Sequence, residues 1–159
     1  MTVKEKDLSK LLTQQPVKEL DTAQIMQTIP HRYPFLLIDK LKIIEDKKYA
    51  VGIKCVTVNE PFFKGHFPSK PVMPAVLILE SMAQSCAAMM MTYPEYKNKI
   101  AYFMAIEKAK FRKPVFPGSV IETALEILRH GTMGKCRFAS YVNKELVAQA
   151  QMSFVLEGK

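Results

Sequence analysis

Cysteine is scarce in this chain of 159 residues, and the three that occur are scattered: Cys55, Cys86 and Cys136. No two of them have the C-x-x-C or zinc-ligand spacing, so the pattern indicates neither a redox motif nor a structural zinc site. An odd, scattered set is typical of free thiols in a reducing compartment. We therefore expect a cytoplasmic protein with free cysteines, and we predict no metal ion and no cofactor.

We also expect neither a secretory signal peptide nor a membrane span. Residues 1–7 have no apolar core of the kind found in secretory signal peptides. The longest apolar stretch, residues 72–91, contains Glu80 and Gln84 near its centre. Because a charge at that depth is costly in lipid, we interpret this stretch as a buried helix and expect no membrane insertion.

Acidic residues are outnumbered, 15 against 23 Lys and Arg, which gives a formal net charge of +8. Such a balance favours an acidic partner: nucleic acid, an anionic membrane surface or an acidic protein. The densest basic run, residues 108–113, is either a solvated strand end or a docking patch. A nucleic-acid-binding module is the non-enzymatic alternative. It would explain the charge, but the chain has no recognised nucleic-acid motif and no interleaved aromatic residues in the basic run.

The length and a hydrophobic fraction of 48% suit a single domain. We assign residues 1–20 to a charged, weakly patterned N-terminal extension and residues 21–159 to the domain. The expected helices span 23–29, with an N-cap at residues 21–22, and 75–92, with Pro74 in its first turn. Alternating patterns predict strands at residues 36–44, 49–56, 99–113, 119–129, 135–142 and 146–156. One apolar helix beside an antiparallel sheet indicates an α+β domain whose sheet curls around the helix, or is completed by a partner subunit.

The long helix is apolar on nearly every side except at Glu80 and Gln84, which lie four residues apart and so share a face. An ionised carboxylate is expensive in such surroundings unless it is paired. Glu80 either points to solvent or is a functional carboxyl group inside a cleft. Gln84 either donates to a Glu80 oxygen or is a buried amide bonded to backbone.

His66 lies 14 residues before Glu80, in a loop with prolines at 68, 71 and 74. Each proline fixes φ and removes a backbone donor, so the loop should be stiff. A lone histidine is more often structural than catalytic. A rigid loop that leads into a helix with a buried carboxylate favours a catalytic role for this one.

Together these groups suit proton transfer at carbon. Removing water from a β-hydroxyacyl thioester needs a base for the α-hydrogen, an acid for the hydroxyl and a donor for the thioester oxygen. A neutral imidazole, a carboxyl group in an apolar cleft and the free N–H groups around Ala75 could supply them.

Three ordered motifs resemble those of the β-hydroxyacyl-acyl carrier protein dehydratases of bacterial fatty acid synthesis. They are Pro30-His31-Arg32-Tyr33-Pro34-Phe35-Leu36-Leu37-Ile38-Asp39, the segment from Gly65-His66-Phe67-Pro68 to Glu80-x-x-Ala83-Gln84, and Lys110-Phe111-Arg112-Lys113-Pro114-Val115-x-Pro117-Gly118. The resemblance covers roughly residues 22–156. Glutamate at position 80 matches the dehydratase-only branch, because the related dehydratase-isomerases carry aspartate.

The resemblance implies a hot-dog fold, a long helix wrapped by an antiparallel sheet, in homodimers that assemble into hexamers. It implies active sites at the dimer interface, with the catalytic residues His66 from one subunit and Glu80 from the other. Substrate contacts are expected from His31, Phe67, Val72, Ala75 and Gln84. For His31, holding its own loop by a hydrogen bond is the alternative. Ala75 stands where the family usually has glycine, which keeps the N–H but adds a methyl group.

The implied reaction converts (3R)-hydroxyacyl-acyl carrier protein to the trans-2-enoyl form, with a bearing on lipid A supply through β-hydroxymyristoyl chains. Acyl carrier protein is acidic, so basic residues near the tunnel should steer it. The candidates are Lys64, Lys70, Lys110 and Arg112. Thioester hydrolysis on the same fold is the nearest alternative, but a hydrolase would have little use for the His66 loop.

Overall fold

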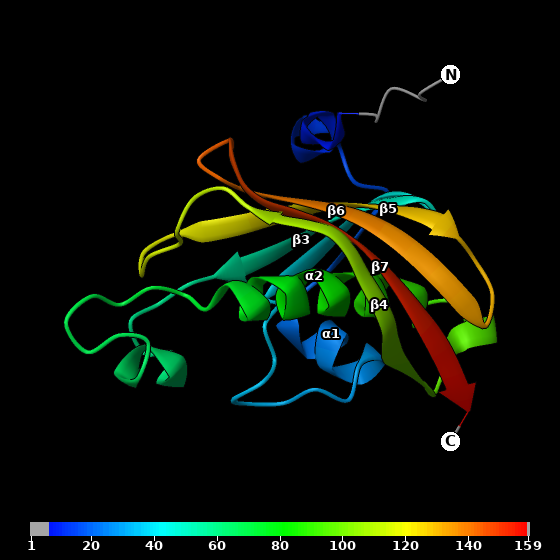
Figure 1. Cartoon of the computed structure of the whole chain (residues 1–159). Helices are drawn as coiled ribbons and strands as arrows, with labels where there is room; N and C mark the ends of the chain where they lie inside the picture. Colours follow the sequence, from blue (N-terminus) through cyan, green and yellow to red (C-terminus); the bar gives the residue numbers. More distant parts are fainter. Residues whose placement is uncertain (1–6, 159) are drawn as a thin grey trace.

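The computed structural model describes residues 7–158, in which seven strands form one antiparallel sheet in the order β1-β2-β3-β5-β6-β7-β4 (Figure 1). The strands are β1 Lys18–Leu20, β2 Lys40–Glu45, β3 Tyr49–Cys55, β4 Lys99–Phe111, β5 Val120–Arg129, β6 Met133–Val142 and β7 Glu145–Gly158. The helices are α1 Thr22–Thr28 and α2 Ala75–Met90, with short 3₁₀ turns η1 Leu8–Thr13, η2 Pro61–Lys64 and η3 Pro94–Tyr96.

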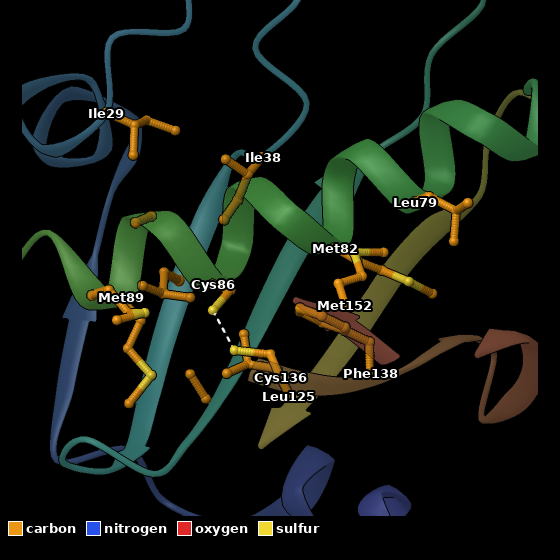
Figure 2. Packing of buried hydrophobic residues seen from close by; sticks show 14 of the residues in the cluster. Ile29, Ile38, Leu79, Met82, Cys86, Met89, Leu125, Cys136, Phe138 and Met152 are labelled. Carbon is orange, nitrogen blue, oxygen red and sulfur yellow. Dashed lines mark hydrogen bonds between the residues drawn. The ribbon is translucent and has the colours of Figure 1, made fainter. Parts of the chain in front are cut away.

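Helix α2 lies in the hollow of the curled sheet (Figure 1), which confirms the expected α+β hot-dog architecture. Ten of its 16 residues are buried, so most of its circumference needs cover from other elements. Figure 2 shows Cys86 of α2 pointing at Cys136 of β6, with the two Sγ atoms 2.7 Å apart. Both are free thiols, as expected, and burial raises the pKa of the Cys136 thiol.

Helix α1 begins as its sequence predicts. Asp21 is the N-cap and accepts a hydrogen bond from the N–H of Gln24, whose side chain accepts from the N–H of Asp21 in return. This reciprocal capping box satisfies two backbone donors that a helix start leaves open. The chain then turns at Pro30 into a loop that lies beside α2.

Strand β2 begins at Lys40, four residues later than the expected start at residue 36. The later start is caused by hydrogen bonds to α2, a distant part of the chain. The N–H of Leu37 donates to the side chain of Gln84, and the carbonyl of Leu37 accepts from Ser81. Because α2 takes these backbone groups, they are not available to a neighbouring strand.

The N-terminal segment covers the convex face of the sheet (Figure 1). Leu8 and Leu11 of η1 are buried in a second apolar cluster with Tyr49 and Tyr141, and β1 pairs with β2. Residues 8–20 therefore share the sheet and its packing with the residues that follow. None of the helices formed by residues 7–158 is long and apolar enough to cross a lipid bilayer.

Helix α2 approaches β3 closely at Gly52. A Cβ atom at this position would lie 2.1 Å from Oγ of Ser85, so glycine is required for the helix to sit at this depth. We expect Gly52→Ala to lower the free energy of unfolding by about 1–3 kcal/mol, because overpacking forces α2 away from the sheet. Chemical denaturation would measure the loss. Gly65→Ala is the matched control, since a Cβ there meets no atom within 4 Å, and an equal loss in both variants would contradict the explanation.

Candidate active site

Glu80 faces an apolar cavity of about 260 Å³ between α2 and the first residues of β4. Its side chain is 15% exposed, so it does not point into bulk solvent. The cavity runs along α2 from Glu80 to Met91, about 16 Å at 1.5 Å per residue. Residues 99–103 of β4 form one wall, and the apolar side chains Phe138, Met152, Phe154 and Leu156 close it.

Gln84 holds Glu80 and the preceding loop at the same time. Its Nε2 donates to Oε1 of Glu80 at 2.9 Å and to the carbonyl of Phe35 at 2.7 Å. Its Oε1 accepts from the N–H of Leu37 at 2.7 Å. The two roles considered for Gln84 are therefore both realised, and the amide joins the carboxylate to residues 35–37.

His31 lies at the same cavity, with Nε2 3.6 Å from Oε1 of Glu80. Burial lowers the pKa of His31, with a smaller lowering from the charge of Arg32, while the Glu80 carboxylate acts in the opposite direction. The loop itself is held by Arg32, whose guanidinium donates to the carbonyls of Met26, Ile29 and His31. Holding this loop by hydrogen bonds, the alternative role considered for His31, is thus done by Arg32. The sequence patterns did not indicate Arg32.

His66 lies in the loop between η2 and α2, and its Nδ1 is 2.7 Å from the carbonyl of Val72. Since a carbonyl only accepts, Nδ1 carries a proton, and Nε2 is the ring nitrogen that can present a lone pair. The ring stacks on Phe67 with centroids 4.0 Å apart, and the N–H of Val72 returns a bond to the carbonyl of His66. These contacts fix the imidazole in the form that a general base requires.

Helix α2 begins immediately after this loop. Pro74 is the N-cap, not a residue of the first turn as the sequence suggested, because its φ and ψ of −55° and 129° are not helical. Among residues 7–158, no side chain caps the start of α2 with a hydrogen bond. Helix geometry leaves the first N–H groups, beginning with Ala75, without carbonyl partners, and the helix dipole makes them suitable donors to a developing negative charge.

Within one chain, the structure brings together some of the expected site residues. His31, Glu80 and Gln84 meet at the cavity. His66, Phe67 and Val72, in the loop before α2, and Ala75, the first residue of α2, do not line it. The cavity wall formed by residues 99–103 was not anticipated. Its place beside α2 depends on β4 pairing with β7, a contact between distant parts of the chain.

A curled antiparallel sheet around a long helix, with an acid and an imidazole at an apolar cavity, defines a hot-dog-fold protein with an enzyme-like site. Solved structures support the fold. This chain resembles the dehydratase heterocomplex ApeI:P from Xenorhabdus doucetiae, with a TM-score of 0.73 and 13% identity over 85% of this chain and 91% of that chain. It also resembles a hot-dog-like protein from Thermanaerovibrio acidaminovorans, with a TM-score of 0.56 and 16% identity over 70% and 82%.

The family is more specific than the fold. Residues 29–151 match the FabA-like domain, so the chain belongs to the FabA-like family. It is 49% identical over 138 residues to the 3-hydroxyacyl-[acyl-carrier-protein] dehydratase FabZ of Pelotomaculum thermopropionicum. The aligned region covers 86% of this chain and 99% of that protein. The FabZ of Clostridium botulinum strain Loch Maree is 49% identical over 140 residues, or 87% and 97% of the two chains. The resemblance seen in the sequence motifs is thereby confirmed.

Proposed function

We propose that this chain is a hydro-lyase of fatty acid biosynthesis that removes water from 3-hydroxyacyl chains carried on acyl carrier protein. Identity of 49% over nearly the whole length of dehydratases named for this reaction supports the proposal. The structural observation that carries it is the carboxyl group of Glu80 at the side of an apolar cavity. An acid in such a position can serve the hydroxyl group of an otherwise apolar substrate.

The chemistry assigns one role to each group. Nε2 of His66 takes the α-hydrogen as the C–H bond breaks and its electrons form the new double bond. The β-hydroxyl group leaves with a proton from Glu80, as water. The N–H of Ala75 stabilises the negative charge that develops on the thioester oxygen. The product is the trans-2-enoyl thioester, and return of the proton from His66 to Glu80 restores both groups.

The reaction needs both groups at one substrate, and we infer that a homodimer supplies them, His66 from one subunit and Glu80 from the other. Support comes from β4, an edge strand with exposed apolar side chains, notably Tyr102, Phe103 and Ile106. An unpaired apolar edge invites pairing with a second copy of itself. Assembly of three dimers into a hexamer is part of the proposal.

The apolar cavity is the proposed site of the acyl chain. Ala87 lines it about two turns beyond Glu80. We expect the phenyl ring in Ala87→Phe to fill the space of roughly three methylene groups of the acyl chain. At about 0.8 kcal/mol for each group, kcat/KM for long acyl chains should fall about 50-fold. Four-carbon substrates should be little affected. Turnover with hydroxyacyl carrier-protein substrates of graded length measures this, with Ala23→Phe, on the exposed face of α1, as control. An equal loss at every length would place the acyl chain elsewhere.

The proposal also covers docking of the carrier protein, a role in lipid A supply and the location of the enzyme. The net charge of +8 suits an acidic carrier protein, and Lys64, Lys70, Lys110 and Arg112 are the candidate docking residues. A β-hydroxymyristoyl substrate would give the enzyme a bearing on lipid A precursors, and the length series includes it. A cytoplasmic location is consistent with the free thiols.

One assay separates this function from thioester hydrolysis. We expect purified protein mixed with a crotonoyl thioester to catalyse the reverse reaction, hydration, so that the enoyl absorbance falls while no thiol is released. A thiol reagent in the same cuvette detects hydrolysis. Thiol release at the rate of absorbance loss would contradict the proposal and favour a thioesterase. A gel shift with nucleic acid at physiological ionic strength would favour the nucleic-acid-binding alternative.

A further inference from the structure

Two nitrogen atoms approach the same oxygen of Glu80. Nε2 of Gln84 donates to Oε1 at 2.9 Å, and Nε2 of His31 lies 3.6 Å from that oxygen. Within residues 7–158, the one hydrogen bond to this carboxyl group is made at Oε1, and Oε2 accepts none. The carboxyl group is therefore asymmetric, with one oxygen held and the other available to a substrate.

The surroundings of His31 determine which of its nitrogens carries the proton. Nδ1 is buried and has no hydrogen-bond partner in the described part of the chain. An N–H at Nδ1 would therefore be buried without an acceptor, and the lone pair of Nε2 would then face the carboxylate. A proton on Nε2 avoids both penalties. Protonation of both nitrogens would again bury an unpaired N–H, consistent with the lowered pKa of His31.

We propose that His31 is a positioning residue for Glu80: its neutral Nε2–H, with the amide of Gln84, orients Oε1 and leaves Oε2 as the oxygen that gives the proton to the departing hydroxyl group. The inference rests on the proposed dehydratase function. It assigns opposite tautomers to the two histidines of the site. His31 carries its proton on Nε2, whereas His66 carries it on Nδ1 and donates to Val72.

Residues already in contact keep His31 in place. Its ring stacks on Phe35 with centroids 6.3 Å apart, and the Phe35 carbonyl accepts from Gln84. Arg32 fixes the backbone on the other side through the carbonyl of His31. The imidazole is thus positioned by the same loop that Gln84 ties to α2, so loop position and carboxylate orientation depend on each other.

The tautomers can be measured directly. The full chain has three histidines, so ¹⁵N-histidine labelling and long-range ¹H–¹⁵N NMR at neutral pH give a readable spectrum. We expect the Nε2–H pattern for His31 and the Nδ1–H pattern for His66, with exposed His130 as the reference. An Nδ1–H tautomer or an imidazolium at His31 would overturn the proposal. This spectrum does not depend on activity.

Kinetics test the positioning role. We expect His31→Ala to lower kcat about tenfold, because one of the two nitrogen groups that face Oε1 of Glu80 is removed, with KM within about twofold of the wild type. His31→Gln places an amide N–H near the position of Nε2 and should restore most of kcat, and His130→Ala should change neither parameter. Unchanged kcat in His31→Ala, or a Gln variant no better than Ala, would refute positioning. An inactive wild type would refute the dehydratase function itself.

Discussion

Replacing Glu80 with glutamine is expected to lower dehydratase kcat by about 10²–10⁴-fold, the usual range for removal of a general acid. The amide has almost the shape of the carboxyl group and can still meet Gln84, so the fold should be retained. It cannot give a proton to the leaving hydroxyl. Steady-state dehydration of a hydroxyacyl carrier-protein substrate measures the loss, and thermal unfolding checks that the variant is folded.

Glu145→Gln is the matched control, because Glu145 is 63% exposed and its partner is the exposed Lys113. Exposed ion pairs contribute little to stability. Activity near the wild-type level is expected for this variant. If Glu80→Gln were equally active, Glu80 would not handle the proton of the hydroxyl group, and the carboxylate would have only a structural role.

Replacing His66 should have an effect of similar size, about 10²–10⁴-fold in kcat, because no other group is assigned to take the α-hydrogen. His66→Asn is the informative change. Its side-chain amide can keep the N–H that donates to the Val72 carbonyl, while nothing replaces the lone pair of Nε2. The loop should therefore remain ordered in an inactive protein.

Exchange of the α-hydrogen provides a separate measurement for His66. In deuterated solvent, a base that removes this proton reversibly allows deuterium to enter the substrate or product, detected by mass spectrometry. We expect His66→Asn to lose this incorporation, and His130→Ala to retain it. Incorporation at the wild-type rate in His66→Asn would assign the base to another residue.

Local patterns in the sequence predicted the parts of the fold that depend on neighbouring residues. The capping box at Asp21, the long apolar helix and the alternation in β7 all act within a few residues of one another. The start of β2 was wrong because Leu37 bonds to Gln84 and Ser81, more than 40 residues away. The strand propensity of residues 36–39 carries no information about hydrogen bonds to a distant helix.

The candidate site likewise combines residues that local patterns predicted with residues that only contacts between distant segments bring there. Glu80 and Gln84 could be found because two long polar side chains in an apolar helix are conspicuous. The wall formed by residues 99–103 could not, since the pairing of β4 with β7 places it there. The proximity of His31 to Glu80 likewise depends on the path of a loop, which Arg32 fixes through three backbone carbonyls.

Within one chain, the two groups proposed to act on the substrate are not at one cavity, since His66 does not line the cavity of Glu80. The central claim is therefore that the imidazole and the carboxyl group come from different subunits. The exposed apolar edge of β4 and the apolar cavity, which His66 does not line, both fit an enzyme completed by its own second copy.

Subunit exchange between His66→Asn and Glu80→Gln tests it most directly. Random re-pairing of equal amounts makes half of the dimers mixed, and each mixed dimer has one site with both native groups, so activity should recover to about one quarter of the wild type. Mass spectrometry of the intact dimers verifies the exchange. Recovery near this level is the result expected from sites shared between subunits. No recovery in a sample with verified mixed dimers would contradict them.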